Sequence, residues 1–219
     1  MESKRKVLML SVVGVMLVVL CSIVIFYWYE SNYYVTTEDA KVAGDIVKVS
    51  PQMTGKLLEL EVEEGQSLEK DQIIGRQEMG TLSDTNLEQS VIRAPISGFV
   101  LKKQVTPGEL VSTGQTLIMM VDPMKLYINA NIEETDLAKL KIGQKVEVTV
   151  DEFSGQKMYG EIQSIGKASN SAFSLLSGAT SGTFTKVVQR VPVKIVFEDQ
   201  QNCSGLLLGT NAVVKIHIR

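Results

Sequence analysis

The order of apolar and polar residues divides this chain into one long apolar run and a series of short alternating runs. Residues 7–29 are 23 consecutive uncharged and mostly apolar residues. A helix rises about 1.5 Å per residue, so this run reaches about 34 Å. That is enough to cross a hydrocarbon core of about 30 Å. The pattern predicts one transmembrane helix at 7–29, preceded by a short tail at 1–6.

Beyond residue 34 the pattern becomes that of β-strands. Residues 58–63 alternate apolar and acidic side chains, which predicts that Leu58, Leu60 and Val62 share one face of a strand. Residues 145–150 and 214–218 alternate in the same way. Helical spacing occurs only at 133–140, where Gly143 would end the helix. The part after the membrane helix is therefore predicted to be mainly β.

An internal repeat becomes visible when the chain is shifted by 43 residues. The shift superimposes seven pairs: Gly55 on Gly98, Gly65 on Gly108, Gln72 on Gln115, Leu57 on Val100, Val62 on Val105, Leu68 on Val111 and Ile74 on Leu117. We interpret the four glycines as structural turns, because glycine reverses the chain at little steric cost. One unit cannot bury its own apolar face, so two halves, 46–78 and 91–122, are predicted to face each other in a β-sandwich.

The flanks of the apolar run predict its orientation. Lys4, Arg5 and Lys6 precede it, and Glu30, Glu38 and Asp39 follow it. Basic residues favour the cytoplasmic side, so we expect a cytoplasmic N-terminus and a single-pass protein whose bulk is extracytoplasmic. A cleaved signal peptide is the alternative. It is disfavoured because the run ends in bulky aromatic residues rather than small ones.

Composition excludes several functions. The net charge of −3 does not suggest nucleic acid binding. Cys21 lies within the apolar run and Cys203 is the only other cysteine, so no intrachain disulfide is expected. His217 is the only histidine, which disfavours both a catalytic triad and a metal site. Glu59, Glu61, Glu63 and Glu64 form an acidic run, more often a solvated strand face than a cation site. We expect no enzyme, no cofactor and no metal.

The paired units resemble the biotinyl/lipoyl domain. Carrier versions of that domain hold a modified lysine at the tip between the halves. The tip here, residues 79–90, contains no lysine. Lys125 lies after the second half, where no tip is expected. The carrier interpretation therefore lacks its essential residue.

Five segments of the chain follow one another in the order typical of one protein family: Thr37–Val42, Val49–Gly55, Ile92–Val100, Ala130–Leu137 with Ile142–Gln144, and Phe184–Ile195. On these segments the chain resembles the HlyD/EmrA-type membrane fusion proteins, also called periplasmic adaptors, over nearly everything from residue 4 onward. The resemblance implies a β-barrel after the sandwich and an inner-membrane transporter as partner. The last segment is close to the EmrA branch, which favours a drug/proton antiporter as the transporter, with an ATP-driven exporter as the alternative.

One departure from this family concerns its coiled-coil hairpin. Only the 12 residues of the tip separate the paired units, far fewer than two stable helical arms need. We expect no contact with an outer-membrane channel through a hairpin. The pump would then serve an envelope without an outer membrane or release its substrate close to the inner membrane. A deletion in the tip is the alternative.

Residues 168–185 are rich in Ser, Thr, Gly and Ala but include Phe173, Leu175 and Leu176. This composition predicts a loop between barrel strands. Its apolar side chains either contact the partner transporter or membrane, or fold back on the barrel.

The predicted architecture has a β-sandwich domain at 35–122, in which residues 35–45 run past the barrel, and a β-barrel at 123–219. The predicted function is that of a membrane-anchored, self-associating adaptor of a multidrug efflux or secretion pump. The alternative is a membrane-anchored ligand-binding or signalling module without a transporter.

Overall fold

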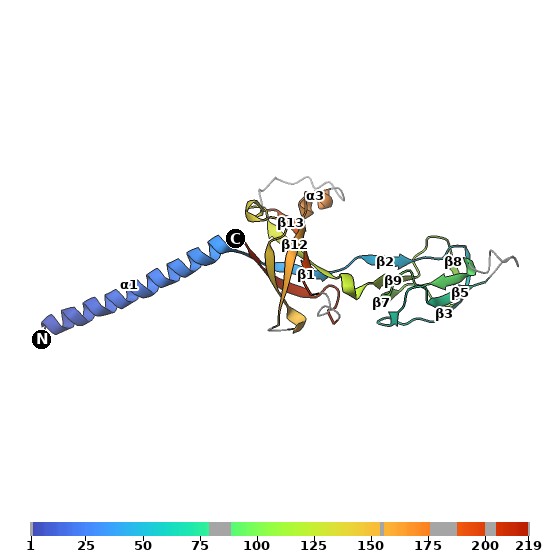
Figure 1. The fold of residues 1–219 in the computed structure, drawn as a ribbon, viewed down its shortest axis with the longest axis horizontal. Helices are drawn as coiled ribbons and strands as arrows, with labels where there is room; N and C mark the ends of the chain where they lie inside the picture. Colours follow the sequence, from blue (N-terminus) through green and yellow to red (C-terminus); the bar gives the residue numbers. More distant parts are fainter. Residues whose placement is uncertain (1, 79–88, 154–155, 176–187, 200–204, 219) are drawn as a thin grey trace. The chain divides into compact units, whose positions relative to one another are not determined.

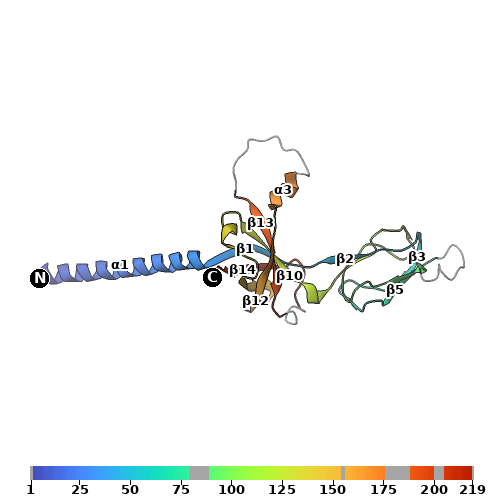
Figure 2. The ribbon, with the colours of Figure 1, turned by 45° about the horizontal axis from the view of Figure 1, so that its top comes forward.

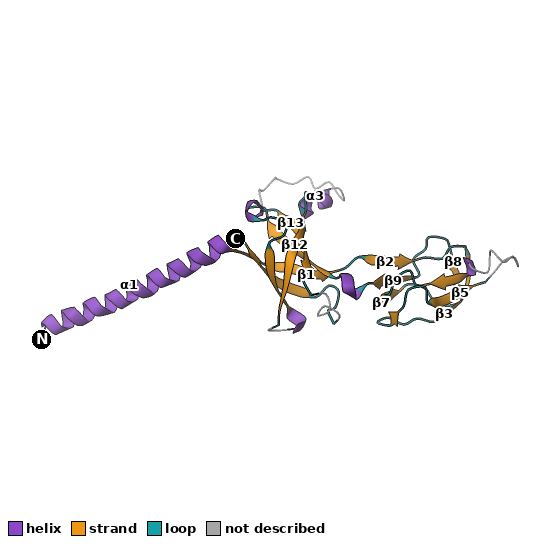
Figure 3. Ribbon diagram, in the orientation of Figure 1, coloured by secondary structure: helices purple, strands orange, loops and turns teal. Residues whose placement is uncertain are grey.

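The computed structural model describes residues 2–78, 89–153, 156–175, 188–199 and 205–218 (Figure 1). The chain divides into two compact units, each treated separately below. The first comprises residues 1–40, 129–195 and 211–219, and the second comprises residues 41–128 and 196–210. One long helix precedes a chain of strands joined by loops and short helical turns (Figure 3).

The N-terminal helix α1 spans Glu2–Tyr33, so it extends beyond the predicted span at both ends. Its segment Val13–Glu30 is long and apolar enough to cross a membrane, and none of that segment is buried against protein. The large side chains Met16 and Phe26 are 67% and 64% exposed. A bilayer would cover this apolar surface, as expected for a single-pass anchor.

Six strands form a closed barrel in the order β1-β10-β13-β12-β11-β14 (Figures 1 and 2). Their bounds are Tyr34–Ala43, Tyr127–Glu133, Arg190–Phe197, Lys157–Ile165, Lys145–Val150 and Asn211–His217. Residues 34–43 are thus the first barrel strand, so the prediction that 35–45 belong to the sandwich domain and run past the barrel is wrong for 35–43. These residues form part of the barrel wall, because the side chains of Val35, Ala40 and Val42 are buried. The sandwich is therefore inserted between β1 and β10.

Alternation of buried and exposed positions around the barrel follows the predicted pattern. β11 pairs antiparallel with β14, so that Val146 lies opposite Ile216 and Val148 opposite Val214. All four side chains are at most 1% exposed. The predicted strands at 145–150 and 214–218 are confirmed, because their apolar positions share the inner face of the barrel.

The predicted helix at 133–140 is wrong in extent. β10 continues to Glu133, and only Leu137–Lys139 forms a single 3-10 turn, η2. Ile128, Ala130 and Ile132 are buried at alternate positions of β10, so barrel packing keeps this part of the chain extended. Two further 3-10 turns, η1 at Pro123–Lys125 and η3 at Asp151–Phe153, follow strands β9 and β11.

The sandwich consists of two four-stranded sheets, β2-β9-β7-β4 and β6-β5-β3-β8. The strands in chain order, β2 to β9, are Ile46–Val49, Gly55–Leu60, Ser67–Leu68, Ile73–Gln77, Val91–Arg93, Gly98–Lys103, Leu110–Val111 and Ile118–Val121. The repeat relates β2 to β6, β3 to β7, β4 to β8 and β5 to β9. Under this exchange one sheet order becomes the other. Each half therefore contributes two strands to each sheet, so the halves are interleaved rather than stacked as separate layers.

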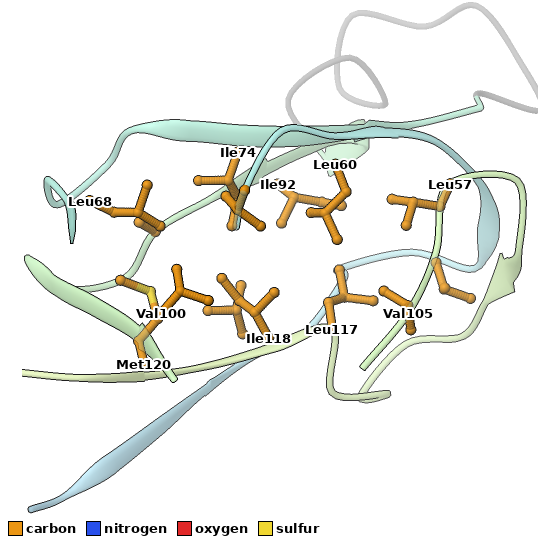
Figure 4. Packing of buried hydrophobic residues seen from close by; sticks show 14 residues of the cluster. Leu57, Leu60, Leu68, Ile74, Ile92, Val100, Val105, Leu117, Ile118 and Met120 are labelled. Atoms are coloured by element: carbon orange, nitrogen blue, oxygen red, sulfur yellow. The ribbon is translucent and has the colours of Figure 1, made fainter. Parts of the chain in front are cut away.

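The repeated apolar positions form the core between these sheets. In Figure 4, Leu57, Leu60, Ile74 and Ile92 face Val100, Leu117, Ile118 and Met120. Each of these side chains is at most 5% exposed. Both members of each apolar repeat pair are buried in this core. The free energy gained by burial is roughly proportional to the apolar area removed from water, so this core is the main stabilising contribution to the sandwich.

The four repeat glycines differ in their structural role. Gly65 and Gly108 lie in turns and have φ of +84° and +97°, where a side chain would be strained. Gly55 and Gly98 instead begin strands β3 and β7. Their lack of a side chain allows close backbone approach: a Cβ on Gly98 would lie 2.1 Å from the Val121 carbonyl oxygen. The interpretation of all four as turn residues is therefore corrected for Gly55 and Gly98.

A bulge changes which leucine of β3 is buried. The register of β3 against β5 shifts between Leu57 and Glu59, so strict alternation fails there. Leu57 is fully buried while Leu58 is 55% exposed. The predicted shared face of Leu58, Leu60 and Val62 is therefore wrong for Leu58.

Two neighbouring substitutions test this correction. We expect Leu57→Ala to lower the free energy of unfolding by about 2–5 kcal/mol, since it leaves a cavity in the core. We expect Leu58→Ala to change it by no more than about 0.5 kcal/mol, since the side chain is largely in water. Urea denaturation followed by far-UV circular dichroism measures both. Equal losses, or a larger loss at Leu58, would contradict the bulged register.

Candidate functional site at the barrel end that receives the membrane helix

Strand polarity identifies the end of the barrel at which the membrane helix arrives. β1 begins at Tyr34 directly after α1, and the Ile218 amide after β14 donates a hydrogen bond to the Tyr33 carbonyl oxygen at 2.9 Å. β11 is antiparallel to β14 and to β12, so β11 begins and β12 ends at this same end. The turn at 141–144 and the connection that follows β12 both lie here.

Aromatic and charged contacts fasten the helix to the barrel at this end. Glu30 in the last turns of α1 forms an ion pair with Lys215 on β14. The Lys215 ammonium also lies 4.1 Å from the centre of the Tyr34 ring. The Tyr34 ring makes an edge contact with His217, with ring centres 4.9 Å apart. His217 is therefore a packed, partly exposed residue of the barrel wall.

A polar network holds the connection after β12 against the barrel. Asp39 on β1 accepts hydrogen bonds from Asn131 Nδ2 at 3.1 Å and from Arg190 Nη1 at 2.5 Å. Asn131 Oδ1 in turn accepts from Asn170 Nδ2 at 2.8 Å. Asn170 begins the short helix α3, Asn170–Leu175. Four elements, β1, β10, β13 and α3, are thereby joined at one point of the barrel.

A second contact and a depression adjoin this network. Ser171 of α3 donates to Gln189, and the Gln189 carbonyl oxygen accepts from the Glu134 amide at 2.9 Å. A depression of about 390 Å³ lies beside them, lined by Glu134, Leu137, Gly166, Lys167, Ala168, Ser169, Gln189 and Val191. The start of the 168–185 segment thus borders a hollow at the barrel end that receives the anchor.

The three predicted partner-contact residues fall at the limit of what the structure describes. Phe173 and Leu175 belong to α3, of which the backbone at these positions is described. Leu176 lies outside the described residues, as do 177–187. The structure fixes the base of this segment and leaves the contact itself a prediction.

Two members of the acidic run, Glu59 on β3 and Glu64 after it, make structural contacts. Glu59 pairs with Arg76 at 3.4 Å, and Glu64 accepts a hydrogen bond from the Lys103 amide at 3.0 Å. Within the described part of the chain, no group of three or more His, Cys, Asp or Glu residues could hold a metal ion.

Two groups of the described chain have a clearly shifted pKa. Burial, with the nearby Asp45 carboxylate, raises the pKa of the Tyr127 phenol. A hydrogen bond to Glu147 raises the pKa of the Lys157 ammonium. Both shifts favour the form already present at neutral pH, so neither prepares the group for proton transfer.

Comparison with known proteins places this arrangement in a family. The family model described as an RND MFP barrel-sandwich hybrid domain matches residues 45–123, and that of an AAEA-like β-barrel domain matches 125–217. YhbJ of Bacillus subtilis (strain 168), provisionally assigned as an efflux system component, is 36% identical over 189 residues. The match covers 85% of this chain and 81% of YhbJ. The chain belongs to the HlyD/EmrA-type membrane fusion proteins.

Other relatives of this membrane fusion protein are longer. The multidrug export protein EmrA of Haemophilus influenzae is 38% identical over 136 residues, covering 61% of this chain and 35% of EmrA. The chain thus spans about a third of the length of that relative. The solved periplasmic adaptor protein EmrA has the same fold, with a TM-score of 0.57 at 14% identity, covering 84% of this chain and 98% of that one. Membrane fusion proteins are adaptors rather than enzymes, and membrane anchoring agrees with the span in α1.

Proposed function

We propose that this membrane fusion protein is the anchored adaptor of a multidrug efflux or secretion pump. It couples an inner-membrane transporter to release of the substrate outside the membrane. The observation that supports the proposal is the position at which the 168–185 segment starts. Its described residues, 168–175, follow β12 at the barrel end that receives the membrane helix, where the Asp39 network holds Asn170. A partner in the same membrane is within reach of that end.

The orientation of the anchor follows from its flanking charges. Lys4, Arg5 and Lys6 lie on one side of the span, and Glu38 and Asp39 lie on the other. The positive-inside rule places the N-terminus in the cytoplasm and both β units outside. Self-association into a ring or smaller oligomer would surround the exit path of the transporter.

A drug/proton antiporter is the favoured transporter, with an ATP-driven exporter as the alternative. The preference for an antiporter comes from the segment 184–195, whose sequence resembles the EmrA branch. The last residues of this segment, from Arg190 onward, form β13. Multidrug export is the function given for the EmrA relatives.

The short tip suggests where the substrate is released. β5 ends at Gln77 and β6 begins at Val91, and residues 79–88 between them lie outside the described part. YhbJ is matched over most of its length, whereas EmrA is matched over about a third. We expect this adaptor to work without an outer-membrane channel. Co-purification of such a channel with the native chain would overturn this point.

Replacement of Phe173, Leu175 and Leu176 by Ser tests the partner contact. In cells that express the adaptor with its transporter, we expect the triple variant to lose co-purification of the transporter. Drug susceptibility should rise to that of cells lacking the adaptor, because the apolar contact would be gone. Quantitative pull-down and growth inhibition measure the two effects.

The matched control replaces the exposed apolar residues Leu58, Ile73 and Leu110 of the sandwich unit by Ser. This control should keep both the transporter and the resistance. Unchanged transport in the first variant would show instead that its three side chains fold back on the barrel. If deletion of the whole chain leaves drug susceptibility unchanged and no transporter co-purifies, the ligand-binding alternative replaces the adaptor function.

A further inference from the structure

An exposed isoleucine stands at the tip of a rigid turn on the barrel end that receives the membrane helix. Ile142 is 70% exposed, although Leu140, two residues earlier, is only 7% exposed. Gly143 has φ of +85°, which closes the turn sharply. A large apolar side chain is thus directed away from the barrel at a fixed position.

Gln144 fixes this turn and ties it to the end of the chain. Its Oε1 accepts from the Lys141 amide at 2.8 Å, and its Nε2 donates to the Lys139 carbonyl oxygen at 3.2 Å. The same Nε2 donates to the Ile218 carbonyl oxygen at 3.1 Å. Since the Ile218 amide donates to the Tyr33 carbonyl oxygen, two hydrogen bonds connect the turn to the last residue of α1.

The depth of the helix end indicates the depth of the turn. The predicted span ends at Tyr29, and Tyr33 lies four residues later, about 6 Å along the helix. The headgroup layer on each side of the hydrocarbon core is roughly 5–7 Å thick. Tyr33 therefore lies at the level of the phospholipid headgroups, and the turn at 141–144 lies two hydrogen bonds away from it.

Basic residues surround Ile142 on the chain. Lys139, Lys141 and Lys145 flank it, although the protein as a whole carries a net charge of −3. Lys139 pairs with Asp136 at 2.7 Å, and Lys145 lies opposite Glu161 in the strand register. Lys141, next to Ile142, is exposed. An apolar tip with cations beside it matches an anionic phospholipid surface, where each lysine near the surface contributes attraction.

We propose that the 141–144 turn is a second membrane contact, which inserts Ile142 into the headgroup layer beside the helix and places Lys141 on anionic phospholipid. The contact fixes the tilt of the barrel relative to the bilayer, which a single membrane helix does not fix alone. The inference needs α1 to span the bilayer but does not depend on the identity of the transporter.

Tryptophan fluorescence in the full-length chain tests this contact, because Trp28 is its only tryptophan. Trp28→Phe removes the native signal, and Ile142→Trp places a new probe on the turn. The protein is reconstituted in vesicles of phosphatidylcholine and phosphatidylglycerol that contain phospholipids brominated either near the headgroup or near the chain end. We expect a blue-shifted emission and stronger quenching by the shallow bromines. Lys141→Gln should weaken the phosphatidylglycerol-dependent part of the insertion equilibrium about fivefold.

The control carries Trp28→Phe with Leu110→Trp, since Leu110 is 72% exposed and lies in the sandwich unit. It should remain unquenched. Absence of quenching at position 142, or equal quenching at both positions, would overturn the proposal. Quenching at 142 that is replaced by protection when the transporter is added would assign this surface to the transporter instead. Drug susceptibility of the same variants separates failure of this contact from failure of the adaptor function.

Discussion

Gly98→Ala is expected to cost the sandwich more than about 4 kcal/mol of stability, a loss in the exceptional range for one methyl group. A Cβ on Gly98 would lie 2.1 Å from the Val121 carbonyl oxygen and 2.9 Å from its carbonyl carbon. Both are backbone atoms at the β7–β9 pairing, where Phe99 lies opposite Val121. No side-chain rotation relieves this contact, so the two strands would have to separate.

Two other repeat glycines provide a graded comparison. On Gly55, the repeat partner of Gly98, a Cβ would lie 2.9 Å from the Glu78 carbonyl oxygen, a milder overlap. On Gly108 no atom lies within 4 Å, and the cost is that of a positive φ, about 1 kcal/mol. We expect the loss to fall in the order Gly98, Gly55, Gly108.

Native-state hydrogen exchange of the sandwich amides measures this order, since Trp28 in the membrane helix does not report on the sandwich. A Gly98→Ala protein as stable as Gly108→Ala would refute the close approach.

The structure could be predicted from the sequence where a single local rule determines it. The run 7–29 predicts its helix because length and apolarity suffice for a span. The repeat predicts the core because each apolar match, such as Ile74 with Leu117, is buried. The Ile92–Val100 segment links β6 to β7, and buried Ala94 exchanges backbone hydrogen bonds there with the turn at 71–72.

Prediction failed where partners distant in sequence decide the outcome. The sequence of β1 does not distinguish it from a linker, because its place in the barrel depends on pairing with β10 and β14, which are distant in sequence. The interleaving of the two halves depends on strand pairing that a repeat alone does not reveal. Leu58 became exposed through a bulge, which alternation cannot indicate. Asp39, Asn131 and Arg190 were not predicted to act together, since 92 and 151 residues separate Asp39 from the other two.

Asp39→Ala is expected to impair transport far more than it lowers stability. The Asp39 carboxylate is 34% exposed and its partner Arg190 is 50% exposed, so water screens the pair. Its removal should therefore cost only about 1 kcal/mol of unfolding free energy. The same change leaves Asn131 without this acceptor. The chain of hydrogen bonds that ends at Asn170 then loses its anchor on β1.

The functional loss follows from what that chain of bonds holds. α3 has only six residues, too few to be stable without tertiary contacts. With this chain of hydrogen bonds weakened and the Ser171–Gln189 bond still in place, the amides of α3 should exchange faster, and the start of the 168–185 segment should be held less firmly at the barrel. We expect drug resistance to fall most of the way to that of cells without the adaptor.

Glu38→Ala is the matched control, because Glu38 is the preceding residue, carries the same charge and is exposed. It should leave both exchange in α3 and resistance unchanged. Asp39→Asn keeps an acceptor for Asn131 but loses the charge that pairs with Arg190, so an intermediate effect is expected. If Asp39→Ala accelerates exchange in α3 without reducing resistance, the position of this segment does not control coupling. The transporter would then have to engage another surface of the barrel.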